Sequence, residues 1–210
     1  MKFDVIYADP PWKFNSRRTG GSMKSGATQI YKTMSLEDLK RMPVPELAAD
    51  DCYLVMWWVG AMPDEALDLM HSWGFRLQNM NGVVWGKLTA TGKLVFGMGN
   101  TTRAGTESCL IAVKGKPKPF SRSERAFFQA KVGEHSAKPE EAREKLERLF
   151  GPFTRKVELF HRGYGKGNWT VFGNQSYPSL VLDEFGFRQP VLAELQMQQE
   201  EVERWKLKVN

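Results

Sequence analysis

The sequence predicts an α/β protein with a mostly parallel sheet, and two observations lead to this fold class. Short, continuously apolar runs alternate along the chain with segments of helical periodicity, which is the pattern of strands buried between two layers of helices. The first apolar run ends abruptly at a proline pair, as a buried strand does where its carboxyl end leaves the sheet. No composition break, repeat or low-complexity segment divides the 210 residues, so we expect one domain.

The chain opens with a strand, a long loop and a short helix. Residues 3–8 are apolar apart from Asp4 and form the first expected strand. The polar, glycine-bearing residues 13–30 follow as a long loop of the kind that is usually functional. Ser35, with Asp38 three positions later, is typical of a helix N-terminus, so a short helix should begin there.

The middle of the chain continues the alternation. Residues 52–59 predict the second strand, and Pro63 can open a helix that ends near Gly74. A strand is expected over 75–85, followed by a second long polar loop over 86–105.

The last part begins with a strand over 108–113 and a helix over 140–150, with Pro139 before the helix and Gly151-Pro152 as its stop. Two short strands are expected over 157–160 and 169–172. Apolar residues near helical spacing predict an amphipathic helix over 191–207. We therefore expect residues 1–187 to form the domain body and 188–210 to add a C-terminal helix to the same domain.

Composition excludes several classes of protein. Hydrophobic residues make up 41% and charged residues 26% of the chain, which is an ordinary globular balance. The longest strongly apolar stretch, residues 52–62, is far shorter than the ~20 residues that a membrane span needs, and the N-terminus does not resemble a signal peptide. Cys52 and Cys109 are predicted to be reduced core thiols of a cytoplasmic protein, and neither they nor the three histidines have metal-ligand spacing, so no metal is expected.

The net charge of +6 is unevenly placed, which favours a polyanionic partner. Lysines and arginines gather in two stretches that hold almost no acid, whereas the acids concentrate in the expected helices. The first stretch contains Lys13, Arg17, Arg18 and Lys24, and the second contains Lys114, Lys116, Lys118, Arg122 and Arg125. Loops that follow a phosphate backbone have this composition, although solvated surface loops can have it too.

The tetrapeptide Asp9-Pro10-Pro11-Trp12 carries the strongest chemical signal. An exocyclic amine on a base is a poor nucleophile because its lone pair is delocalised into the ring. Two acceptors that hold both amine hydrogens pull the nitrogen toward tetrahedral geometry, and the Asp9 carboxylate and the Pro10 carbonyl can act as such a pair on a stiff backbone. Trp12 could offer a face on which an unstacked base rests. The alternative is that the tetrapeptide is only a tight turn after a strand.

This tetrapeptide resembles the signature of the adenine-N(6) methyltransferase family that includes the catalytic subunit of the eukaryotic mRNA adenosine methyltransferase and many bacterial and phage members. Further segments spread over residues 3–175 are similar to segments of that family. They are Tyr31-Lys32-Thr33-Met34-Ser35, residues 107–115, residues 135–140, Glu158-Leu159-Phe160, Arg162 and Gly173-Asn174-Gln175. The resemblance implies a Rossmann-like, S-adenosylmethionine-dependent methyltransferase domain with the permuted ("beta") motif order, in which the catalytic motif precedes the cofactor segments.

The resemblance also implies roles for individual residues. S-adenosylmethionine is the implied cofactor. Lys138 would pair with its methionyl carboxylate, Asp9 would hold its ammonium, and Arg162, Asn174 and Gln175 would contact its ribose and adenine. The stretch 165–168 is shorter than the corresponding loop of the long family member, so contacts from this part are not carried over.

The expected partner is nucleic acid, with DNA favoured over RNA because the compact chain resembles the small bacterial and phage members. The residues expected to contact it are Lys13, Arg17, Arg18, Lys24, Tyr31 and Arg103, in two loops that would clamp a flipped base. Three alternatives stay open: a cytosine-N(4) DNA methyltransferase, an RNA adenosine methyltransferase and a catalytically inactive nucleic-acid-binding paralogue. The sequence allows a monomer or a homodimer.

Overall fold

The computed structural model describes residues 1–13, 33–99, 101–133, 137–163, 167–173, 175–176, 179–191, 194–197 and 200. Its centre is a seven-stranded sheet in the order β5-β3-β4-β2-β1-β6-β8. The strands are β1 (Phe3–Ala8), β2 (Ala48–Trp58), β3 (Arg76–Leu88), β4 (Thr106–Lys114), β5 (Phe127–Lys131), β6 (Lys156–Leu159) and β8 (Trp169–Phe172). β4 pairs antiparallel with both of its neighbours, and every other pairing in this sheet is parallel. The predicted α/β class with a mostly parallel, Rossmann-like sheet is therefore confirmed.

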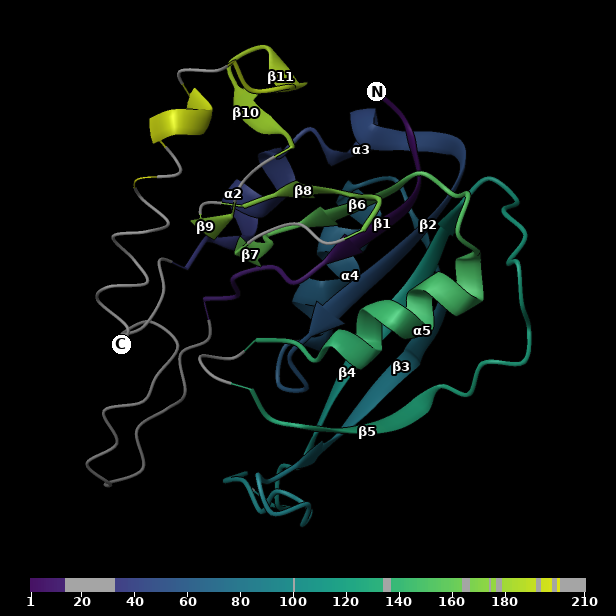
Figure 1. The fold of residues 1–210 in the computed structure, drawn as a ribbon, viewed down its shortest axis with the longest axis vertical. Coiled ribbons are helices and arrows are strands. Elements are labelled where there is room, and N and C mark those ends of the chain that lie inside the picture. Colours follow the sequence, from purple (N-terminus) through teal and green to yellow (C-terminus); the bar gives the residue numbers. More distant parts are fainter. Residues whose placement is uncertain are drawn as a thin grey trace.

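Helices cover both faces of the sheet, as Figure 1 shows, with α5 in front and α4 behind. The helices are α2 (Leu36–Arg41), α3 (Val44–Leu47), α4 (Pro63–Ser72) and α5 (Glu140–Phe150). α2, α3 and α4 bury apolar side chains against one face, where Ile6 and Leu54 lie. α5 packs on the other face, over Tyr7 and Val55. Alternate residues of β1 and β2 thus serve two cores, which explains why both strands are continuously apolar.

The helix boundaries follow the capping residues that the sequence offers. The Ser35 side chain accepts a hydrogen bond from the Asp38 backbone N–H at 3.1 Å, and α2 begins one residue later. Pro63 is in the first turn of α4. Gly151 ends α5 with φ 87°, a backbone conformation that a side chain would strain, and a Cβ there would lie 2.9 Å from the Phe120 ring.

Several elements differ from the expectation. β2 starts at Ala48 rather than residue 52, and β3 continues to Leu88, so the expected loop over 86–105 begins as strand. β5 was not expected, and neither were the short pairs β7 (Arg162–Gly163) with β9 (Gln175–Ser176) and β10 (Val181–Asp183) with β11 (Gly186–Arg188). Of the expected C-terminal helix, residues 194–197 and 200 are helical, and most of the remainder lies outside the described residues.

The topology marks one edge of the sheet, which we call the carboxyl edge because the parallel strands end there. From β1 the chain reaches β2 through α2 and α3 on one face, while α5 leads into β6 on the other face. β1 is therefore the switch point of the sheet, where open α/β folds bind ligands beyond the carboxyl end. Because β4 is antiparallel, its first residues lie at this same edge.

Candidate functional site at the carboxyl edge

Asp9 lies directly after β1, at the switch point. Its backbone N–H donates to the Leu159 carbonyl at 3.4 Å, which ties the end of β1 to the end of β6. The Asp9 side chain is 31% exposed, so it is accessible from outside. The predicted catalytic carboxylate therefore stands where this class of sheet exposes its ligand-binding residues.

Four charged side chains of alternating sign form a chain from this point. Lys138 Nζ donates to Asp9 Oδ2 at 2.7 Å and lies 3.5 Å from Glu107 Oε2. Lys87 Nζ donates to the other Glu107 oxygen at 2.5 Å. These residues come from the ends of β1 and β3, the beginning of β4 and the segment before α5, so we call them the edge ion chain.

Electrostatics favour the charged forms of Lys138 and Glu107, the two middle members of this chain. Burial by itself disfavours the charged form of Lys138, but attraction to Asp9 and Glu107 outweighs it and raises the pKa of Lys138. Burial likewise opposes ionisation of Glu107, but Lys138 and Lys87 lower the pKa of that carboxyl. The Trp57 ring, 5.3 Å from Lys138 Nζ, adds a cation–π contact beneath the ammonium.

The backbone of the tetrapeptide 9–12 is held rigidly. The Trp12 N–H donates to the Pro10 carbonyl at 2.8 Å, which makes a tight turn, and the Met34 N–H donates to the Pro11 carbonyl at 3.0 Å. A carbonyl oxygen has two acceptor positions, so the Pro10 oxygen keeps one for a ligand. These two hydrogen bonds are consistent with the fixed direction that we predict for this acceptor.

Trp12 does not present the open stacking face that we expected. Its side chain is 8% exposed and packs in the core with α2, α3 and α4. Its Nε1 donates to the Trp57 carbonyl at 3.2 Å, near the carboxyl end of β2. The expectation that a base stacks on Trp12 is wrong in this structure, because the indole is buried in the core beside β2. The indole instead attaches the turn that carries Asp9 and Pro10 to β2.

The predicted cofactor residues fall into two groups. Asp9 and Lys138 are brought into contact, as above. Arg162 of β7 pairs in register with Gln175 of β9, just past the ends of β6 and β8. Phe160, between β6 and β7, has φ 64°, an unusual conformation for a residue with a side chain, and the chain turns there. Asn174 lies outside the described residues.

The predicted nucleic-acid residues are placed in part. Lys13 is exposed next to the turn, and the Arg103 guanidinium lies 4.9 Å from the centre of the exposed Phe96 ring. Arg17, Arg18, Lys24 and Tyr31 lie outside the described residues.

Sequence reasoning missed the site role of Glu107 and Lys87. Glu107 belongs to a segment that resembles the family, but its position depends on the direction of β4, which local sequence does not reveal. A second missed cluster lies on the α5 face of the sheet, where Arg143 of α5 is ion-paired with Glu158, and Glu158 Oε1 lies 3.0 Å from His161 Nδ1. This cluster joins α5 to the end of β6.

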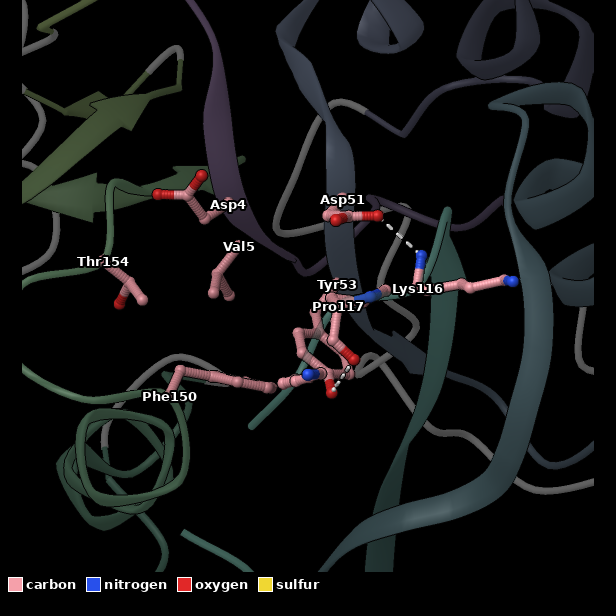
Figure 2. Close-up of a pocket in the computed structure, with 9 residues that line it drawn as sticks. Asp4, Val5, Asp51, Tyr53, Lys116, Pro117, Phe150 and Thr154 are labelled. Atoms are coloured by element: carbon pink, nitrogen blue, oxygen red, sulfur yellow. Dashed lines mark hydrogen bonds between the residues drawn. The ribbon is translucent and has the colours of Figure 1, made fainter. Parts of the chain in front are cut away.

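A hollow of about 330 Å³ lies at the opposite edge of the sheet (Figure 2). Asp4 and Val5 at the start of β1, with Tyr53 of β2, line it, and the Lys116 N–H donates to Asp51 at 2.6 Å on its rim. Lys116 and Lys118 belong to the second basic stretch, which therefore does not join the edge ion chain. We assign the functional site to the carboxyl edge because the predicted site residues Asp9 and Lys138 meet there.

The fold and the site define a Rossmann-like α/β methyltransferase domain in which the Asp9–Trp12 turn follows the first strand. The MT-A70 family model matches residues 3–175, and the chain belongs to this family. Among the described residues, no helix is long and apolar enough to cross a membrane.

Individual relatives agree with this assignment. The chain is 34% identical over 191 residues to the type II methyltransferase M.MunI of Mycoplasma sp, an alignment that covers 80% of the chain and 76% of that protein. It is 30% identical over 178 residues to the N(6)-adenosine-methyltransferase catalytic subunit METTL3 of Homo sapiens, covering 83% of the chain. The N(6)-adenosine-methyltransferase MT-A70-like protein of Drosophila melanogaster is 31% identical over 178 residues. The alignments span 28% and 27% of the last two proteins.

Proposed function

We propose that this protein transfers a methyl group from S-adenosylmethionine to the exocyclic 6-amino group of adenine in DNA. Membership of the MT-A70 family and the names of the relatives support adenine-N6 methylation of nucleic acid. The observation that carries the proposal is the rigid Asp9-Pro10 turn at the switch point, with Lys138 Nζ 2.7 Å from the Asp9 carboxylate. The choice of DNA rests on the alignment with the type II methyltransferase, which covers 76% of that protein against 28% of the human subunit.

The residues of the carboxyl edge fit the zwitterionic end of S-adenosylmethionine. Lys138 has three N–H donors, of which Asp9 and Glu107 engage two, so one can bind the methionyl carboxylate. Asp9 supplies the negative charge for the ammonium. Arg162 and Gln175, side by side on β7 and β9, would contact the ribose and adenine of the cofactor, together with Asn174.

When bound, S-adenosylmethionine would supply an electrophilic methyl group: the adenine nitrogen would take up this methyl as its bond to the sulfonium sulfur breaks, the sulfur would leave as the neutral thioether of S-adenosylhomocysteine, and the nitrogen would lose one proton to water. The Asp9 carboxylate and the Pro10 carbonyl accept the two amine hydrogens and thereby orient the nitrogen lone pair. Trp12 acts as a positioning residue. Its indole N–H donates to the Trp57 carbonyl, and this hydrogen bond holds the turn that carries Asp9 and Pro10 against the core.

The first experiment incubates the protein with methyl-labelled S-adenosylmethionine and oligonucleotides of duplex DNA, single-stranded DNA or RNA, then identifies the modified nucleoside by mass spectrometry. We expect N6-methyldeoxyadenosine, and a loss of about 100-fold or more in rate for Asp9→Ala. Asp64→Ala, which removes an exposed carboxylate from α4, is the control. Label on cytosine would overturn the base assignment, label on RNA alone would overturn the choice of DNA, and full activity of Asp9→Ala would overturn the mechanism.

The second experiment measures cofactor binding by titration calorimetry. We expect Lys138→Met to weaken S-adenosylmethionine binding by roughly 10- to 100-fold, because a charge-assisted hydrogen bond is lost. Lys131→Met removes an exposed lysine of β5 and should change nothing. Equal affinities for the two variants would refute the role of Lys138.

A further inference from the structure

The segment between Lys87 and Glu107 is a compact hairpin that extends beyond the body of the fold, past the ends of β3 and β4 (Figure 1). It folds back on itself twice. At the first reversal, the Thr89 N–H donates to the Lys93 carbonyl at 2.7 Å. At the second, Gly97 and Ala104 exchange backbone hydrogen bonds of 2.7 and 3.2 Å. A Cβ on Gly97 would come within 2.5 Å of the Ala104 carbonyl oxygen, so this close pairing requires glycine. We call the described residues 87–99 and 101–107 the edge hairpin.

The edge hairpin carries three large apolar side chains in the open. Leu94, Phe96 and Met98 are alternate residues of one short segment and are 66%, 78% and 67% exposed. We call these three neighbouring exposed side chains the apolar stripe. Such a stripe on a protruding hairpin is suited to contact with another molecule.

The charged residues between the two ends of the edge hairpin are all cationic. The chain has no aspartate or glutamate between Lys87 and Glu107, but it has Lys93 and Arg103 there. The Arg103 guanidinium is 4.9 Å from the centre of the Phe96 ring, so a cation accompanies the most exposed of the three apolar side chains. A surface that joins apolar tips with cations alone matches nucleic acid, where a phosphate backbone encloses an apolar base stack.

The edge hairpin is also joined to the site. Its first residue, Lys87, and its last, Glu107, form an ion pair of 2.5 Å, and Glu107 lies 3.5 Å from Lys138, the partner of Asp9. The hairpin therefore rises from the same edge of the sheet as the catalytic carboxylate.

We propose that the apolar stripe Leu94-Phe96-Met98 is a wedge that enters the base stack of duplex DNA beside the target adenine and holds the duplex open while that base is outside the stack. The inference rests on the function proposed above. Phenylalanine, leucine and methionine are the side-chain types that proteins insert between base steps, and a base must leave the stack before its amine can be methylated. Lys93 and Arg103 bind the phosphates on either side of the wedge.

The test compares one target adenine in a duplex and in a single strand, using the oligonucleotide that the wild-type protein methylates. The variant is Leu94→Ser/Phe96→Ser/Met98→Ser, and the control is Phe153→Ser, which removes a 96% exposed aromatic ring far along the chain. We expect the variant to lose at least about tenfold in rate on the duplex, because unstacking is no longer assisted, and to keep the wild-type rate on the single strand. A mismatch opposite the adenine should restore most of the duplex rate.

A binding measurement follows the base directly. With 2-aminopurine in place of the target adenine, we expect the fluorescence of the duplex to rise on addition of wild-type protein and of Phe153→Ser, but not of the triple variant. Equal rate losses on duplex and single strand, or an unchanged duplex rate, would overturn the wedge. A wild-type oligomer that the triple substitution converts to a monomer would assign the stripe to contact between two copies instead. Absence of methyl transfer by the wild type to any nucleic acid would instead be a failure of the proposed function.

Discussion

Lys138 keeps its positive charge although its side chain is only 18% exposed. Burial alone would favour the neutral amine, but the carboxylates of Asp9 and Glu107 raise the pKa of Lys138 above its ordinary value. The lysine therefore remains protonated throughout the neutral range. A charge that is already desolvated and oriented binds an anionic ligand without a further cost of ordering.

A pH-dependent contribution to stability follows from Glu107, whose carboxyl pKa is lower in the folded protein than its ordinary value. Its contribution is present above the unfolded pKa of about 4.3 and is lost as pH falls through the folded pKa. We expect Glu107→Gln to lower the free energy of unfolding at pH 7, and the difference from wild type to shrink as pH falls below about 4. Urea unfolding at a series of pH values measures this, with Glu184→Gln, at an exposed turn, as control. A difference that stays constant with pH would contradict the assignment.

At the scale of elements, α5 docks on the sheet through polar as well as apolar contacts. Ala142, Leu146 and Phe150 pack in the core. Glu147 faces Lys156 of β6, whose side chain is fully buried, with Oε2 3.2 Å from Nζ, and also accepts a hydrogen bond from the Trp169 indole. This glutamate thus neutralises a lysine that has no access to water.

We expect Glu147→Ala to destabilise the protein by about 3 kcal/mol, because it leaves Lys156 buried with an uncompensated charge. Glu144→Ala removes an exposed glutamate from the same helix and should change stability by less than about 0.5 kcal/mol. Denaturant unfolding of both variants measures the difference. Equal stabilities would show that the Thr154 carbonyl, 3.2 Å from Lys156 Nζ, is a sufficient partner.

The elements that the sequence predicts correctly are those with strong local signals. The helix 140–150 has a proline before it and a glycine after it, and β1 is a short apolar run that ends at prolines. β5 was missed because three of its five residues are exposed and only Ala130 is buried, and its place is set by pairing with β3. The antiparallel direction of β4 depends likewise on the order of strands, which no local pattern records.

In the site too, some residues could be predicted from the sequence, whereas others depend on how the strands are arranged. The family resemblance assigned Asp9 and Lys138, 129 positions apart, to the same cofactor, and the structure brings their side chains into direct contact, which was not predicted. Glu107 was not expected in the site because only the reversed direction of β4 brings it there. Trp12 was misjudged because the residue type suggests stacking, whereas its burial is decided by the neighbouring strand.

For the whole molecule, the sheet separates two cores, and each contains one cysteine. Cys52 belongs to the core under α2, α3 and α4, and Cys109 to the core under α5. Burial raises the pKa of Cys52 to about 12 and raises that of Cys109 well above its ordinary value. Neither thiol should therefore form the reactive thiolate while the protein is folded.

We expect both cysteines to resist alkylation at pH 8 and to become reactive together over the denaturant range in which circular dichroism reports unfolding. The reason is that β1 and β2 contribute side chains to both cores, so neither can open alone. Mass spectrometry of labelled peptides separates the two sites. Labelling of one cysteine at lower denaturant than the other would show that the faces of the sheet unfold independently.

The ion pair at the base of the edge hairpin makes two distant binding events depend on each other. If a phosphate draws Lys87 away from Glu107, Lys138 remains as the partner of the Glu107 carboxylate. Glu107 then holds Lys138 more firmly, so Lys138 attracts the methionyl carboxylate of the cofactor less. Thermodynamic linkage makes this dependence reciprocal, since one coupling free energy governs both affinities. For the two ligands proposed above, the factor by which DNA changes the affinity for S-adenosylmethionine equals the factor by which S-adenosylmethionine changes the affinity for DNA.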